Sequence, residues 1–402
     1  MRNIFKLVSL QSLVMMIHFA FPLFLSIILI RKLDNVHYLI IMSIIYLATL
    51  TNFLVEYGFG ISGTKYISEN LDNPNKIKDK FSIIFFCQIL IYIFSAPLIL
   101  AIDILIYDFS FSYIFHSLLI IFLHVMYPYW FFTSLEKQNL MVAPQLISKI
   151  GGILLIFIIS TEDPVKYLII IEVTYAINLI WSYLKIKNYL SFQSINSNSL
   201  LLEISNNFNF FISKFSSALQ GIIIPNLVIM LSKPDLAIAF VIADRIRAII
   251  AYSFSPISLV FFPFFLKLYQ SNTNNFRQYR FYFSATLIVI VSISVLFLIF
   301  FKEDLIYLFA GEVPKYSTTI LNFLIFSAAL SVINTLIYQQ YLIIDYNESI
   351  YTKKLKNAFF ISLILLLFLF IFYEVFGLIF GILIIEIVVL FMPIKLYFFK
   401  SK

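Results

Sequence analysis

The chain has 402 residues, of which 61% are hydrophobic and 12% charged, and its mean hydropathy is +0.97. Because soluble domains are typically about a quarter charged, this composition excludes a soluble protein and indicates a polytopic membrane protein. The formal net charge of +7 does not indicate nucleic-acid binding, since the basic residues lie in short loops beside apolar stretches.

Apolar stretches of about 20 residues predict membrane-spanning helices. The first stretch is too long for a cleavable signal peptide and lacks a clear cleavage site, so we interpret it as a helix. The eighth is overlong and contains Pro256 and Pro263, which predict a kink. Glu374 and Gly377 alone separate the last two. The twelve expected spans lie near residues 7–30, 38–55, 81–105, 110–132, 142–159, 167–184, 207–231, 236–266, 281–301, 317–341, 358–373 and 375–398.

A segment rich in Ser and Asn, residues 185–206, separates six of these spans from the other six. We interpret it as a cytoplasmic linker between an N-terminal lobe, residues 1–184, and a C-terminal lobe, residues 207–402. The predicted fold class is therefore an all-α polytopic membrane protein with about twelve transmembrane helices in two six-helix lobes. Such paired halves are typical of transporters with a central site.

The loops also predict an orientation. With the N-terminus in the cytoplasm, 18 of the 28 Lys and Arg residues fall in cytoplasmic segments, six in outer segments and four within the spans. Cytoplasmic loops carry an excess of Lys and Arg, so we expect both termini to be cytoplasmic. The outer loops are short, which leaves any chemistry to the helix bundle.

The four basic residues inside the spans are Lys149, Lys214, Arg245 and Arg247. A cation at bilayer depth is costly and persists mainly where it faces a cavity or a partner, and a guanidinium suits bidentate capture of phosphate or carboxylate. These residues are therefore candidates for binding an anionic substrate. Alternatively, they pair with acidic residues to hold the bundle together, or the lysines extend to the membrane surface.

Three acidic residues, Glu172, Asp244 and Glu386, also lie deep in the predicted spans. Asp244 and Arg247 stand three residues apart and are expected to be able to pair on one helix face. A carboxylate in a low dielectric can titrate near neutral pH, so these three residues are candidates for coupling transport to protons or sodium.

An enzymatic function would need a constellation of catalytic residues, and the sequence offers none. The four histidines show no metal-ligand spacing with cysteines or carboxylates. His116 and His124 lie two turns apart on one apolar helix, and we expect both to be hydrogen-bonded interior residues. We therefore expect no catalytic residue, no metal and no cofactor.

Short motifs resemble those of Wzx-type polysaccharide flippases. The segment Pro128–Lys137 (PYWFFTSLEK) resembles their motif of proline, tryptophan, two phenylalanines and Leu-Glu-Lys, and Val55–Thr64 (VEYGFGISGT) is similar to their Tyr-Gly-Phe signature. Leu10-Gln11 with Pro22-Leu23, and the eighth span with Ala243–Arg247, Ser255-Pro256 and Phe262-Pro263, fit the same family. The resemblance covers roughly residues 1–270. Thr133-Ser134 departs from the usual Gln-Gly, and the first outer loop lacks the usual glycines.

The resemblance implies a transporter of the multidrug/oligosaccharidyl-lipid/polysaccharide exporter superfamily with a MATE-like fold. Its expected cargo is an oligosaccharide on undecaprenyl diphosphate, flipped to the outer leaflet of the bacterial inner membrane for O-antigen (lipopolysaccharide biosynthesis) or capsule-type polysaccharide. The family also implies a polysaccharide polymerase and a chain-length regulator as partners. The alternatives are a multidrug exporter, a peptidoglycan-precursor flippase and a membrane polymerase or ligase, although the short outer loops argue against an enzyme.

Overall fold

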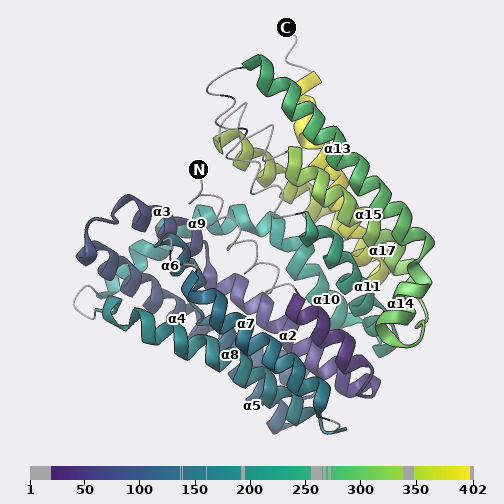
Figure 1. Cartoon of the computed structure of the whole chain (residues 1–402), viewed down its shortest axis with the longest axis horizontal. Coiled ribbons are helices and arrows are strands. Elements are labelled where there is room, and N and C mark those ends of the chain that lie inside the picture. The colour runs from purple at the N-terminus through teal and green to yellow at the C-terminus, as the bar shows by residue number, and fades with distance from the viewer. Residues whose placement is uncertain are drawn as a thin grey trace. The chain divides into compact units, whose positions relative to one another are not determined.

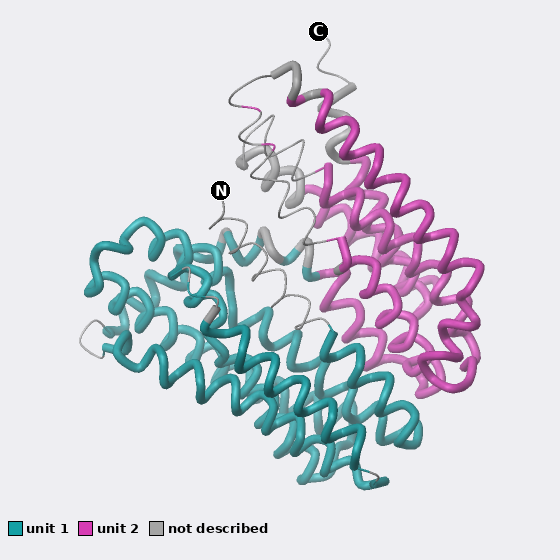
Figure 2. Tube along the Cα trace, in the orientation of Figure 1, with its two compact units in different colours: residues 1–218 teal, residues 219–402 magenta. Residues whose placement is uncertain are grey.

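The computed structural model describes residues 20–135, 137, 139–159, 161–191, 195–254, 265, 269, 273–337 and 348–398. These residues form helices joined by loops, with no β-strand among them. The chain divides into two compact units, unit 1 (residues 1–218) and unit 2 (residues 219–402), coloured separately in Figure 2. The prediction of an all-helical protein is confirmed for this part of the chain.

Unit 1 contains two kinds of helix, long apolar ones that can span a membrane and short connecting ones (Figure 1). Along the chain they are Ala20–Ile30, α2 (Asn35–Glu56), α3 (Phe59–Glu69), α4 (Pro74–Leu105), α5 (Phe111–Val125), α6 (Tyr129–Ser134), α7 (Asn139–Ile158), α8 (Pro164–Ile186), the 3-10 turn η1 (Lys187–Tyr189) and α9 (Ser197–Ala218).

The two motifs nearest the N-terminus pack against each other in unit 1. Tyr57 and Gly58 both adopt left-handed backbone conformations, with φ of 44° and 88°, and so form the tight turn between α2 and α3. On α3, a Cβ atom at Gly63 would lie 2.6 Å from the ring of Trp130 on α6. Phe131, which follows Trp130, has its ring centroid 4.2 Å from that of Phe81 on α4. A small residue at position 63 therefore lets the aromatic segment of α6 close against α3 and α4.

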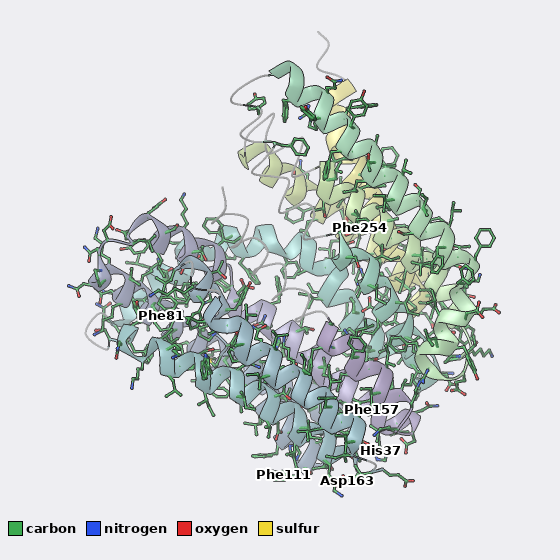
Figure 3. All side chains as sticks on the ribbon, viewed as in Figure 1. His37, Phe81, Phe111, Phe157, Asp163 and Phe254 are labelled. Carbon is green, nitrogen blue, oxygen red and sulfur yellow. The ribbon has the colours of Figure 1, made fainter. Side chains whose placement is uncertain are left out.

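Two residues of the loop before α2 form hydrogen bonds at helix ends, one at the end of α7 and one at the start of α2. The Lys32 ammonium group donates to the carbonyl oxygens of Ile156, Phe157 and Ile159 at 2.6–3.0 Å, where a cation satisfies the unpaired carbonyls at the end of α7. Asp34 caps α2 by accepting from the backbone N–H of His37 at 2.8 Å. Figure 3 shows His37 and Asp163, from two predicted outer loops, at the same end of unit 1, with Phe81 toward the other end.

The segment predicted to be a linker belongs largely to unit 1. Within the predicted linker, Glu203 on α9 forms an ion pair with Lys80 on α4, with 2.6 Å between Nζ and Oε2, and the N–H of Ser191 donates to Ser82 Oγ at 2.8 Å. The units divide after Ala218, so the predicted start of the second lobe at residue 207 falls inside α9. Pairing across more than a hundred residues, which sequence spacing does not show, attaches α9 to the first unit.

Unit 2 is built around α11, whose alanines let neighbouring helices approach closely. Ala237, Ala239 and Ala243 are almost fully buried, and α11 packs extensively against α15. The helices of unit 2 are η2 (Leu219–Ile223, a π-helical turn), α10 (Ile224–Leu231), α11 (Pro234–Ser253), α13 (Thr273–Phe300), α14 (Lys302–Ala310), α15 (Ser317–Leu336) and α17 (Glu348–Phe398).

Eight helices among the described residues are long and apolar enough to cross a membrane. Seven of these helices correspond to the second to sixth, ninth and tenth predicted spans. The remaining one, Asn357–Phe391, lies in α17. That helix breaks at Glu374, whose φ of 51° and ψ of −131° are non-helical, so α17 contains the last two predicted spans divided at the predicted position. The seventh span is the continuous run α9–η2–α10. Pro256, Pro263 and residues 7–19 lie outside the described residues.

Candidate functional site

Unit 1 encloses a cavity of about 300 Å³ between the helix at Ala20–Ile30 and α2, α4, α5, α6, α7 and α8. Aromatic and polar side chains dominate its lining, and several come from the two packed motifs. The lining residues are Phe21, Pro22, Ile45, Ala48, Thr49, Asn52, Glu56, Gln88, Leu123, His124, Val125, Tyr127, Tyr129, Trp130, Gln145, Lys149, Tyr175 and Asn178.

Lys149 on α7 lines this cavity. Its side chain is 5% exposed, and its ammonium nitrogen lies 5.9 Å from the centroid of the Phe21 ring, within the range of a cation–π interaction. The rings of His124 and Tyr175, which also line the cavity, lie 5.2 Å apart. The lysine predicted to bind substrate therefore lies at a cavity surrounded by aromatic rings, and its role in binding stays a prediction.

Two buried amide side chains of the cavity lining form hydrogen bonds with described residues through their nitrogen and not through their oxygen. Gln145 donates through Nε2 to the Tyr127 hydroxyl at 2.6 Å, and that hydroxyl donates to Met141 Sδ at 3.0 Å. Asn178 donates through Nδ2 to Ser148 Oγ at 2.6 Å and to the carbonyl of Thr174 at 2.8 Å. The two amide oxygens, Gln145 Oε1 and Asn178 Oδ1, accept no hydrogen bond from any residue that the structure describes.

The amide orientations follow from these partners. A backbone carbonyl can only accept, so the Asn178 nitrogen must face Thr174 and its oxygen must face away. Tyr127 gives its own proton to Met141, so it accepts from Gln145. A buried acceptor without a donor is unfavourable by about 1–3 kcal/mol, which makes these oxygens features that call for a functional explanation.

Among the described residues that line this cavity, Lys149 is the one member of the four predicted cations. Arg245 and Arg247 belong to unit 2, and Lys214 lies on α9, where its side chain is outside the described residues. Arg247 forms the predicted ion pair with Asp244: its Nε and Nη2 both lie 2.7 Å from Asp244 Oδ1. Both side chains are less than a tenth exposed, so the pair is a buried one. Arg245 is half-buried on the same helix.

The two remaining predicted acids are also hydrogen-bonded within their own units. Glu172 on α8 lies 2.6 Å from Nδ1 of His116 on α5, which confirms a hydrogen-bonded interior histidine. Glu386 on α17 accepts from Asn334 on α15 at 2.5 Å, and the charge of Arg247 also acts on it. These contacts account for the burial of the acids, and their part in ion coupling stays a prediction.

Asp103 is a buried acid that the sequence did not single out. It lies at the end of α4 in unit 1 and is 0% exposed. Neither carboxylate oxygen accepts a hydrogen bond among the described residues, although Ser117 on α5 lies beside it. Its position inside an apolar run, between Ile102 and Ile104, was the available signal.

Comparison with solved structures identifies the fold. A multidrug resistance MATE family transporter of the MOP superfamily, in an inward-facing conformation, aligns with 96% of this chain and 96% of its own at a TM-score of 0.70 and 12% identity. The chain has the fold of the MATE transporters. The predicted MATE-like fold and multi-pass membrane character are thereby confirmed.

Two further structures share this fold. The lipid II flippase MurJ, in an inward closed conformation, aligns with 98% of this chain and 87% of its own, at a TM-score of 0.64 and 17% identity. A MOP superfamily transporter from Pyrococcus furiosus, described as having a binding pocket of reverse polarity, aligns with 100% of this chain and 97% of its own. Its TM-score is 0.61 and its sequence identity 13%. No protein-family model and no curated protein matches the sequence.

Proposed function

We propose that this protein is a flippase that moves oligosaccharide units linked to undecaprenyl diphosphate from the inner to the outer leaflet of the bacterial cytoplasmic membrane. The observation that carries the proposal is the polar, aromatic cavity with Lys149 inside one unit of a MATE-fold chain. A lipid bilayer cannot solvate a sugar head group, and such a cavity supplies the hydrogen bonds and the charge that lipid lacks. The motif resemblance to Wzx-type proteins supports the same cargo.

Transport would proceed by alternating access, with the polyprenyl chain remaining in lipid while the head group occupies the protein interior. Lys149, Lys214, Arg245 and Arg247 are proposed to bind the polar head group of the cargo. Glu172, Asp244 or Glu386 would couple the change of access to protons or sodium. Both termini would lie in the cytoplasm, and a polymerase and a chain-length regulator would act on the delivered units.

Deletion of the gene in its host tests the proposal. Lipid-linked oligosaccharide and surface polysaccharide are extracted from the deletion strain and from strains complemented with the wild-type, Lys149→Met or Lys166→Met gene. Lys166 is an exposed residue at the start of α8 and serves as the matched control. We expect complete, unpolymerised units on the cytoplasmic side, loss of surface polysaccharide, and rescue by all but Lys149→Met.

The other outcomes assign the protein to the alternatives. Units that reach the outer leaflet and stay unpolymerised would identify a polymerase or ligase. Accumulation of a peptidoglycan precursor would identify a precursor flippase like MurJ. Unchanged polysaccharide with altered drug sensitivity would identify a multidrug exporter.

A further inference from the structure

We infer that the cavity of unit 1 binds a sugar ring of the cargo and does not bind its diphosphate. The inference rests on the proposed function for the identity of the cargo, and it deepens that function by assigning one part of the cargo to one set of residues. The charge, the polar groups and the shape of the cavity support it in turn.

The charge of the cavity is balanced. Among the described residues that line it, Lys149 is the only Lys or Arg and Glu56 the only Asp or Glu, so these two formal charges cancel. Sites that capture phosphate groups use several cations or backbone N–H donors. A diphosphate would bring at least two negative charges to one ammonium group that already has a carboxylate in the same lining. The cavity is therefore poorly matched to a diphosphate.

The neutral polar groups match a carbohydrate. Asn52 and Gln88 contribute amides from α2 and α4, and an amide group can both donate and accept. The Thr49 hydroxyl on α2 donates to the carbonyl of Tyr46 at 2.7 Å and can still accept. Sugar hydroxyls have the same dual capacity, whereas phosphate oxygens at neutral pH mainly accept. Sites that bind small molecules commonly combine an apolar or aromatic lining with a few polar groups of this kind.

The two unpartnered amide oxygens distinguish the ligands further. Gln145 Oε1 and Asn178 Oδ1 are acceptors, and only a ligand that donates can satisfy them. A hydroxyl donates, while a diphosphate would place its oxygens against these oxygens and be repelled. Both atoms are covered by neighbouring side chains, so a sugar hydroxyl would reach them through side-chain rotations of the kind that commonly accompany binding.

Aromatic rings provide surfaces for the apolar face of a sugar. Trp130 from α6 and Tyr175 from α8 both line the cavity, and the electron-rich face of an aromatic ring attracts the positively polarised C–H groups of a sugar ring. The volume of about 300 Å³ is at the lower end of the range for small-molecule pockets. The cavity therefore suits one sugar ring rather than a whole oligosaccharide.

The tryptophans make a direct binding experiment possible. The chain has two, Trp130 in the cavity and Trp181, which is 40% exposed on α8. In the full-length Trp181→Phe variant, purified in lipid nanodiscs, Trp130 is the sole tryptophan. Its fluorescence is followed during titration with glucose, galactose, N-acetylglucosamine, glucuronate and inorganic pyrophosphate. We expect a saturable change with at least one sugar and none with pyrophosphate.

Amide variants test which residues bind the sugar. Asn178→Leu is expected to weaken the sugar response at least tenfold. Asn226→Leu is the matched control, because Asn226 on α10 is equally buried, donates to the carbonyl four residues earlier, has an unpartnered oxygen and does not line the cavity. Gln145→Leu provides a second cavity variant should Asn178→Leu fail to fold. An unchanged response in a folded cavity variant would overturn the assignment.

Saturation by pyrophosphate without any sugar response would also overturn the inference, as would the lack of a response to every sugar. These results are separable from the test of the flippase function. A deletion strain that accumulates unflipped units, combined with pyrophosphate binding, would retain the flippase and refute the sugar site. Sugar binding combined with normal surface polysaccharide would retain the site and refute the flippase.

Discussion

The Asp244–Arg247 pair gives the sharpest test of how unit 2 is held together. The residues stand three apart on α11, and both guanidinium contacts to the carboxylate are 2.7 Å long. On an exposed helix such a pair contributes only about 0.2–0.5 kcal/mol. Here both side chains are less than a tenth exposed, so removing one partner takes away the nearest opposite charge from a buried group. That change typically destabilises a protein by about 3–5 kcal/mol.

We therefore expect Asp244→Leu and Arg247→Leu each to lower the free energy of unfolding by about 3–5 kcal/mol. The double variant should lie close to the wild type, because replacing both charges by apolar side chains is often neutral or stabilising. The assay is unfolding of the purified protein in mixed micelles of increasing SDS content. Since the charge of Arg247 also acts on Glu386, the cycle is repeated in a Glu386→Gln background. Additive effects of the two single changes would refute the pairing.

The same double variant separates structure from transport. If Arg247 also binds the cargo, or Asp244 couples transport to an ion, cells with the double variant should contain normal amounts of protein and lack surface polysaccharide. Restored polysaccharide would show that Arg247 serves only the fold, and would remove it from the proposed cation set.

Three further predictions concern unit 1. Gly63→Val should destabilise the protein by about 1–3 kcal/mol through overpacking, because the new side chain would overlap Trp130, whereas Gly151→Val, with open space around it, should change the thermal midpoint little. Lys32→Met should lower the midpoint, because the ammonium donor is removed from three carbonyl oxygens at the end of α7 and, among the described residues, only that of Ile159 keeps a second donor, the Tyr167 hydroxyl. Reduced hydrogen-exchange protection there would confirm it. The backbone N–H of His37 lowers the pKa of Asp34. The stabilisation from Asp34 is thus present above its ordinary pKa of 3.8 and lost as the pH falls through the lower folded value. Asp34→Asn keeps a capping group and should remove that acid dependence from the midpoint, and an unchanged dependence would refute it.

Local features of this fold could be predicted from the sequence, because they depend on residues close together in the chain. Glu374 interrupts an apolar stretch too long for one span, and the backbone breaks there. Asp244 and Arg247 have the spacing of one helix face, and they pair. In both cases the physical cause lies within one or two helical turns.

Features that join distant segments could not be predicted in the same way. His116 and Glu172 are 56 residues apart, and Lys80 and Glu203 are 123 apart, so nothing in their spacing indicates that they meet. The cavity likewise depends on seven helical segments of unit 1, and the sequence singled out Lys149 and the motif with Tyr129 and Trp130 without indicating that they line one cavity. Long-range packing therefore decides which polar residues face a ligand.

The contacts of the buried acids reduce the positive charge that the buried cations can offer to an anionic cargo. From the sequence, four cations against three acids suggested a positively charged route. In the structure, Glu172, Asp244 and Glu386 each have a hydrogen-bonding partner within their own unit, and one of these partners is the cation Arg247. A charge that is already compensated attracts an anion weakly, so counting cations overstates the positive charge offered to a cargo. In the cavity of unit 1, where the formal charges of Lys149 and Glu56 cancel, we expect recognition to depend on hydrogen bonds and aromatic contacts, which salt screens little. Sugar binding to the cavity should therefore be almost independent of ionic strength, and a steep loss of affinity with added salt would instead indicate an anion site at Lys149.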